Sequence, residues 1–228
     1  MTATSARSPA RERLLQAAEQ LFYERGIAAT GVDAVLRRAQ VAPATLYAHF
    51  GGKDHLVAAY LERRHERWRH AWDEALERAG DDPVARVLSV FDALADFHGD
   101  EATRRGCAFL AAAVEVTAAE HPAARWLAAD TALLRERLHD LAVGAGARDP
   151  HALAAELLLL YDGALAARTR TLLVPVPADE SRSGGSPTDE SRSAGSPTEG
   201  STSGGSSTAT PPVVRALAAD AVARHRAG

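Results

Sequence analysis

Apolar residues recur every three or four positions through most of the chain, and no stretch alternates apolar and polar residues with a period of two. This pattern predicts an all-α protein of about nine helices. Prolines, glycines and capping residues mark the expected helix ends. The expected helices cover residues 9–25, 30–39, 43–50, 53–78, 84–97, 107–119, 123–143, 150–170 and 213–226.

The second and third expected helices are short and are joined by a tight turn at residues 40–42. Thr30 is predicted to cap the second helix with its hydroxyl, and Asp33 to return the hydrogen bond three residues on. Two helices of this length bury little surface on their own. We therefore expect the first helix and the start of the fourth to cover Leu46 and Phe50, which completes a candidate helix-turn-helix head.

The third helix is predicted to present a DNA-binding face. With Leu46 and Phe50 turned inward, a rotation of about 100° per residue places small residues on the opposite side. Small side chains let a helix approach base edges in the major groove, and longer ones at its flanks reach phosphates on the groove walls. The candidate DNA contacts on this face and just beyond it are Pro43, Ala44, Thr45, Tyr47, Ala48, His49 and Lys53.

Two of these side chains also have simpler interpretations. Tyr47 could pack half-buried against the first helix, and His49 could be a solvated surface histidine. Helix pairs with short turns occur throughout all-α proteins. The spacing alone therefore indicates a candidate DNA-binding motif without establishing one.

The charge distribution favours a polyanionic partner at the N-terminal end. The 228 residues have a formal net charge of -4, yet residues 1–70 carry 11 basic and 7 acidic side chains. The negative excess therefore lies in the remaining 158 residues. A basic head on an acidic body is consistent with a local contact to a polyanion such as DNA.

Composition excludes several other classes of protein. The single cysteine, Cys107, excludes a disulfide framework and a cysteine-rich metal site. The polar N-terminus and the shortness of the apolar runs predict no membrane-spanning segment. We expect a cytoplasmic protein with no cofactor, no bound metal and no membrane partner.

A low-complexity tract precedes the last expected helix. The ten residues at 179–188 recur with one change at 189–198, and a diverged third copy fills 199–208. A tract rich in Ser, Gly, Thr and Pro buries too little apolar surface to offset the entropy of ordering it. We expect a disordered loop at about 175–209, either an expanded surface loop or, less simply, a tether for a protein partner or for phosphorylation.

The N-terminal region resembles the DNA-binding head of TetR-family transcriptional regulators. The resemblance covers residues 10–61 and is most specific in the run Thr-Leu-Tyr-Ala-His-Phe-Gly-Gly-Lys at 45–53. It implies a homodimeric repressor of nine helices that binds double-stranded DNA through a three-helix head. It also implies DNA contacts at Thr30, Thr45, Tyr47, His49 and Lys53. Two positions depart from the family pattern, because Gln40 replaces a turn glycine and Ala42 replaces a capping serine.

The C-terminal body resembles the family more loosely. Residues 105–110, followed by Glu115 and His121-Pro122, are similar to one recurring type of TetR C-terminal domain. The resemblance implies a dimer interface formed by the last two helices, at about 150–170 and 213–226, which would pair as a four-helix bundle. The implied division is a disordered tail at 1–9, a helix-turn-helix domain at 10–52, and an effector-binding and dimerisation domain at 53–228.

Large side chains in the body suggest a small, apolar or aromatic effector. Each of them could equally be an ordinary core residue. The candidate effector-binding residues are Trp68, Trp72, Phe91, Phe109, Trp126 and Tyr161.

Two other function classes stay open from the residues alone. A DNA-binding architectural protein without an effector would lack a cavity in its body and would bind DNA of any sequence. A helical enzyme finds little support, because the sequence has no phosphate-binding loop and no nucleophile elbow. A metal sensor would need Cys107 to combine with His98 and His121, although a small buried apolar role suits this cysteine better.

Overall fold

The computed structural model describes residues 8–99, 107–173 and 212–226, and this part of the chain consists of helices and turns with no strand. The all-α expectation is confirmed for these residues. The helices are α1 (Pro9–Arg25), α2 (Val32–Ala39), α3 (Pro43–Phe50), α4 (Lys53–Ala79), α5 (Pro83–Gly99), α6 (Ala108–Glu115), α7 (Ala124–Gly144), α8 (Pro150–Leu173) and α9 (Pro212–Arg226). The repeat tract and the first seven residues lie outside the described residues.

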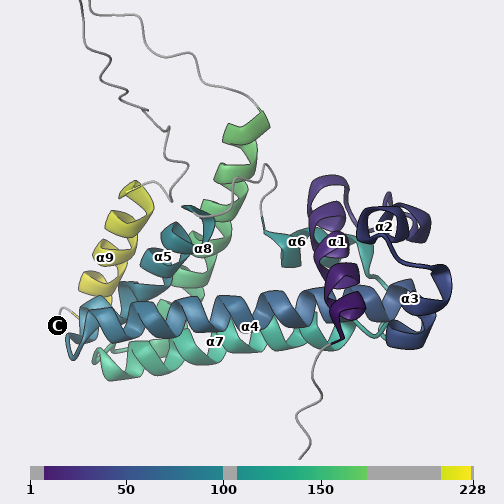
Figure 1. Cartoon of the computed structure of the whole chain (residues 1–228). Coiled ribbons are helices and arrows are strands. Elements are labelled where there is room, and N and C mark those ends of the chain that lie inside the picture. Colours follow the sequence, from purple (N-terminus) through teal and green to yellow (C-terminus); the bar gives the residue numbers. More distant parts are fainter. Residues whose placement is uncertain (1–7, 100–106, 174–211, 227–228) are drawn as a thin grey trace, which may run out of the picture.

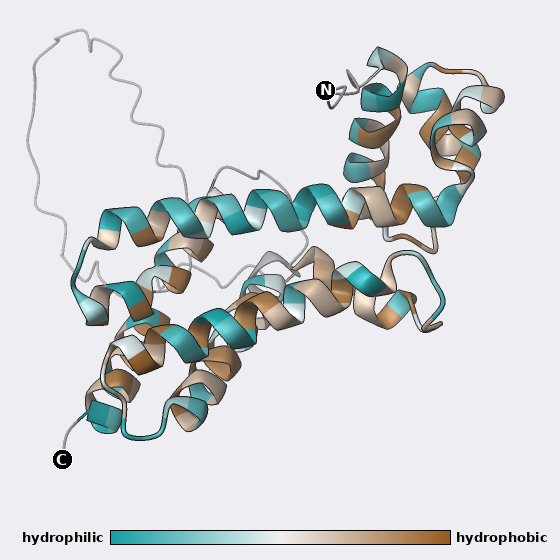
Figure 2. Cartoon of the chain, turned by 90° about the horizontal axis from the view of Figure 1, so that it is seen from below, coloured by the Kyte–Doolittle hydropathy of each residue, from teal (hydrophilic) through white to brown (hydrophobic). Residues whose placement is uncertain are grey.

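Helices α1, α2 and α3 form a head at one end of the long helix α4 (Figure 1). Helix α7 runs alongside α4, and α5, α8 and α9 gather at the end of α4 away from the head. The short α6 lies beside α1. In Figure 2 the hydrophobic residues of α4 concentrate near the head and are sparser along its hydrophilic middle.

The first of two hydrophobic cores holds the head together. Leu14, Leu21 and Phe22 of α1 pack there with Leu46 and Phe50 of α3. The core continues into the start of α4 and into α6, so it also contains buried residues beyond the short helices. The predicted cover over Leu46 and Phe50 is confirmed, since all three elements share this core. The added members from the later helices are Leu56, Val57, Tyr60, Leu61, Ala108, Phe109 and Ala112.

The second core fills the body. It joins the later half of α4 to α5, α7, α8 and α9, and Trp72, Phe91, Leu138 and Leu157 are among its fully buried side chains. Because α4 contributes to both cores, it connects the head to the body. None of the helices in the described part of the chain is long and apolar enough to span a membrane.

Two expected helix ends differ from the structure. The N-cap of α2 is Gly31, and no side chain caps that helix. The capping role predicted for Thr30 is therefore wrong: its hydroxyl donates instead to the carbonyl oxygens of Leu21, at 3.2 Å, and Gly26, at 2.7 Å. Helix α6 ends at Glu115 rather than at 119, because the chain turns at 118–121 ahead of Pro122.

Gln40 holds the turn between α2 and α3 in a strained conformation. With φ 54° and ψ 49° it is the only non-glycine residue with positive φ in the described residues. Its amide donates to the carbonyls at the end of α2, which ends that helix. A side chain in the left-handed region costs about 1 kcal/mol relative to glycine, so the unusual residue at this turn lowers stability.

Gln40→Gly should therefore raise the free energy of unfolding, by about 1 kcal/mol. The matched control is Gln16→Gly, the same substitution at an exposed position inside α1. There glycine should lower the free energy of unfolding by about 1 kcal/mol. Urea denaturation of both variants measures the two changes, and equal losses in both would contradict the strain at Gln40.

Candidate nucleic-acid interface

Helix α3 presents one continuous exposed face. Leu46 is 0% exposed and Phe50 is 8% exposed, and both face the head core. The opposite side carries residues whose side chains are open to solvent, while Thr45 is half-buried. The exposed residues of this face are Pro43, Ala44, Tyr47, Ala48 and His49. The inward and outward sides are those that the sequence predicted.

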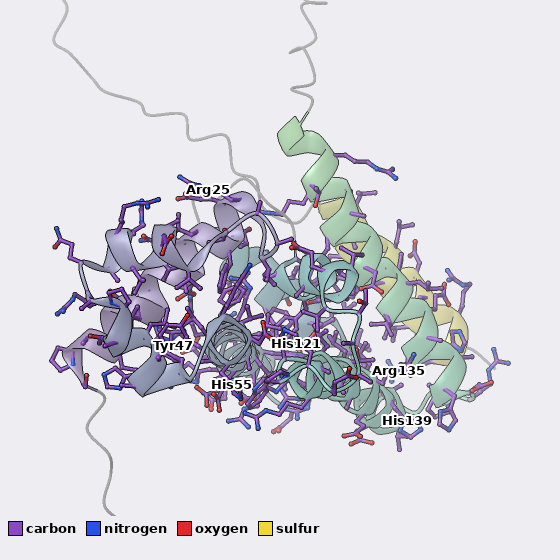
Figure 3. All side chains as sticks on the ribbon, turned by 90° about the vertical axis from the view of Figure 1, so that its right-hand side faces the viewer. Arg25, Tyr47, His55, His121, Arg135 and His139 are labelled. Carbon is purple, nitrogen blue, oxygen red and sulfur yellow. The ribbon has the colours of Figure 1, made fainter. Side chains whose placement is uncertain are left out.

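Tyr47 does not pack half-buried on α1, because 58% of it is exposed. His49 lies on the other flank of the face, and its Nε2 is 3.2 Å from the hydroxyl of Ser8. Ser8 is the N-cap of α1 and accepts a hydrogen bond from the amide of Arg11. One flank of the face is therefore an open phenol, and the other is an imidazole anchored to the start of α1. Figure 3 shows Tyr47 at the head, well separated from Arg135 on α7.

Lys53 stands at the first position of α4, directly after the glycines that end α3. Gly51 has φ 72°, a conformation that an L side chain adopts only with strain, and its amide donates to the carbonyl of Tyr47. This left-handed turn brings Lys53 to the end of the exposed face. The lysine forms no ion pair with any of the described residues.

Several arginines of α1 and of the adjoining part of α4 are already engaged. Arg63 pairs with Glu12 at 2.5 Å, and Arg67 pairs with Glu19 at 2.7 Å. Arg11 places its guanidinium 5.0 Å from the ring centre of Phe50. The positive excess of the head is thus partly neutralised along α1 and α4. The short α3 itself carries no acidic residue.

Thr30 differs from the other candidate contacts. It is 1% exposed, and its hydroxyl is used by the carbonyls at the end of α1. Its side chain therefore does not reach the surface, and the expected DNA contact through this hydroxyl is not supported. A buried threonine at this position instead fixes the turn between α1 and α2.

The comparisons with known proteins agree with this geometry. Residues 14–60 match the family model for bacterial regulatory proteins of the tetR family. A solved TetR-type transcriptional regulator of Streptomyces avermitilis is 33% identical, with a TM-score of 0.60, and the match covers 72% of this chain and 88% of that one. This chain belongs to the TetR family. It is accordingly a DNA-binding transcriptional regulator, and this family is not one of enzymes.

Other TetR-family relatives extend the comparison. A regulator from Streptomyces coelicolor is 27% identical, with a TM-score of 0.70, and the match covers 96% of this chain and 95% of that one. The transcriptional regulator UidR of Escherichia coli is 33% identical over 69 residues, and the repressor NemR of the same species is 27% identical over 106. The matched parts span 35% of UidR and 53% of NemR.

The six candidate effector-binding residues do not form one group. Trp68, Trp72, Phe91 and Tyr161 belong to the body core, whereas Phe109 and Trp126 pack with the core of the head. Trp72 is fully buried, and its Nε1 donates to the hydroxyl of Ser89 at 3.0 Å. Trp72 and Phe91, which is 1% exposed, are therefore structural core residues.

Cys107 does not form a metal site with the described residues, among which no group of three or more potential ligands has suitable geometry. Burial raises the pKa of its thiol to about 11, so the thiol is protonated at neutral pH. His121 is engaged elsewhere: its Nε2 lies 3.5 Å from Asp54, and its Nδ1 accepts from the amide of Ala123. The side chain of His98 lies outside the described residues.

Glu115, at the end of α6, forms a contact with the head that the sequence did not indicate. Its Oε1 accepts a hydrogen bond from the amide of Ile27 at 3.2 Å, and its Oε2 accepts one from the amide of Ala28. Both amides lie in the turn between α1 and α2, 88 and 87 residues away in sequence. The segment around Glu115 was singled out only through the family resemblance, because nothing in local spacing predicts a contact of this range.

Glu115→Ala should expose these two amides to exchange with solvent. Carboxylate hydrogen bonds of this kind contribute about 1 kcal/mol each, so hydrogen exchange at Ile27 and Ala28 should accelerate about fivefold or more. Exchange measured by NMR tests this. Glu120→Ala, which removes an exposed carboxylate five residues on, serves as the control. Equal exchange in both variants would show that Glu115 does not hold the turn.

Proposed function

We propose that the protein is a homodimeric, effector-responsive repressor that binds a palindromic operator. The observation that carries this proposal is the exposed face of α3, with two buried residues behind it and small residues on its crest. An eight-residue helix with this profile fits a major groove. The proposed contacts are Pro43, Ala44, Thr45, Tyr47, Ala48, His49 and Lys53. NemR, which shares part of its sequence with this chain, is itself named as a transcriptional repressor.

In the proposed arrangement the head at about 10–52 binds DNA, and the segment from 53 onward holds the effector site and the dimer interface. The continuity of the first core from α1 into α4 and α6 supports mechanical coupling between these parts. The effector is a small molecule with an aromatic or apolar portion, since aromatic rings gather around the later half of α4. Its binding would favour a dimer whose heads no longer fit the operator.

The outer surfaces of α8 and α9 support the dimer. Leu159 of α8 is 73% exposed, and Val213 and Leu217 of α9 are 59% and 48% exposed. Near Leu159 the outward side of α8 carries small residues, and space is open beside Gly163. An apolar, small-residue helix face of this kind suits close packing against a second copy.

DNA binding is tested first. Duplexes selected from a random library should converge on an inverted repeat with half-sites about one helical turn apart. Lys53→Ala should weaken binding at all salt concentrations and reduce the slope of log affinity against log salt by about 1 per protomer. Tyr47→Ala should weaken binding about tenfold.

The matched control for the charge is Arg135→Ala, which removes an exposed cation from α7. It should leave both the affinity and the salt slope unchanged. If no sequence is enriched and scrambled duplexes bind equally well, the operator proposal fails and an architectural DNA-binding protein replaces it. That alternative has one observation in its favour, the tight packing of Trp72 and Phe91.

The dimer is tested separately by light scattering. The unmodified protein should have about twice the chain mass of 24.1 kDa at micromolar concentration. Leu159→Arg should shift the mass toward a monomer, because a charge buried without a partner disrupts an apolar interface. Val143→Arg makes the same kind of change at a residue of α7 that is 52% exposed, and it should leave the mass unchanged. A monomeric unmodified protein would refute the proposed interface.

A further inference from the structure

A polar cluster lies where α4, α7 and α8 meet, at the junction of the two cores: Trp126 packs against the first core, and Trp68 belongs to the second. The side chain of Asp130 on α7 is 14% exposed. In the described part of the chain its one ion-pair partner is His65 of α4, whose Nδ1 lies 3.8 Å from Oδ1. That separation is beyond hydrogen-bond distance. A largely buried carboxylate therefore lacks a close donor.

A second carboxylate reinforces the negative charge. Asp162 of α8 is half-buried, and no residue of the described ranges donates a hydrogen bond to it or pairs with it. Burial, and after it the charge of Asp130, raises the pKa of Asp162. The same two carboxylates contribute to raising the pKa of Tyr161, after burial and Cys107. The buried guanidinium of Arg64 acts in the opposite direction on Tyr161, so the two carboxylates share this interior with one positive charge.

Aromatic rings lie beside His65, the ion-pair partner of Asp130. The ring of His65 lies 5.8 Å from that of Trp126 and 6.4 Å from that of Phe109, measured between centres. Trp126 precedes Asp130 by four residues on α7, so the two share one side of that helix. Rings beside a carboxylate are the arrangement that binds organic cations, because the ring faces and the carboxylate attract the same charge.

Three buried ring nitrogens near the cluster have no hydrogen-bond partner. They are Nδ1 of His65 and the indole nitrogens of Trp68 and Trp126. Trp68 is 3% exposed and lies one turn after His65 on α4. Its ring centre is 5.7 Å from that of Tyr161, the neighbour of Asp162. Buried indole N–H groups are normally satisfied, as that of Trp72 is by Ser89.

We propose that this cluster, made by His65, Trp68, Trp126, Asp130 and Asp162, binds a small organic cation that carries an aromatic ring and an acceptor oxygen. Asp130 and Asp162 neutralise the cation, the rings of His65, Phe109 and Trp126 enclose it, and the free indole N–H groups donate to the oxygen. The inference rests on the proposed effector response. It narrows the proposed ligand from any small apolar or aromatic molecule to an aromatic molecule that carries a positive charge.

Two probes that differ by one charge test the proposal on the unmodified full-length protein. Choline phenyl ether carries a phenyl ring, an ether oxygen and a quaternary ammonium. Its neutral analogue, 3,3-dimethylbutyl phenyl ether, has the same shape with carbon in place of the ammonium nitrogen. Tryptophan fluorescence and calorimetry should show the cation binding at least about tenfold more tightly than the analogue. Equal affinities, or no saturable binding of the cation up to about 10 mM, would overturn the proposal.

Variants then locate the site. Asp130→Asn should weaken binding of the cation about tenfold and leave that of the neutral analogue unchanged. Asp140→Asn removes an exposed carboxylate from the same helix, and it should change neither affinity. If Asp130→Asn retains the full preference for the cation, the site lies elsewhere and the assignment is wrong. Preserved helical circular dichroism shows that both variants are folded.

The DNA experiment and the ligand experiment can fail independently. Cation binding is measured without DNA, so a negative operator selection leaves its result valid. Conversely, an operator that binds the protein tightly while choline phenyl ether does not bind would refute the cation site alone. When both succeed, choline phenyl ether added to the DNA complex should release the duplex at concentrations near its own dissociation constant.

Discussion

The proposed recognition surface depends on two side chains on the buried side of an eight-residue helix. An isolated helix of this length is unstable in water, so α3 exists because Leu46 and Phe50 are buried in a core supplied by α1 and α4. The same burial fixes the rotation of α3 about its own axis. Tyr47, Ala48 and His49 are exposed as a consequence, and the position of Lys53 follows from the glycine turn that ends the helix.

The body obeys a different constraint. Its aromatic side chains pack against each other in the second core, and the indole N–H of Trp72 donates a hydrogen bond to the hydroxyl of Ser89. Where α4, α7 and α8 meet, by contrast, three buried ring nitrogens have no hydrogen-bond partner, and the ion pair of Asp130 with His65 is long. Burying such groups unpaired lowers the stability of the protein. Binding sites commonly carry such a cost, because a ligand that completes the hydrogen bonds recovers it on binding.

The local elements were predictable from the sequence because their signals are local. Prolines at the start of α1 and α3 and glycines after α1 and α3 determine helix ends within a residue or two. The inward and outward sides of α3 followed from Leu46 and Phe50 alone. The family itself was recognisable from the run at 45–53, and the likeness to solved regulators confirms it.

What the sequence could not supply were contacts between distant segments. Thr30 is a typical capping residue, yet its hydroxyl meets the carbonyls of α1 only after the chain has folded back. Glu115 reaches a turn 87 residues away, which no spacing rule includes. The six large side chains of the body looked equivalent in sequence. Only the packing divides them between the two cores and shows which N–H groups are satisfied.

Because α4 belongs to both cores, a tilt of this helix changes the position of the head relative to the body. Its 27 residues make a rod about 40 Å long. Pivoted at the body end, a tilt of about 5° moves the other end by about 3.5 Å, close to the 3.4 Å that separates successive base pairs along one strand. An angular change of a few degrees in α4 therefore shifts α3 by about a whole step of the sequence that it is proposed to read.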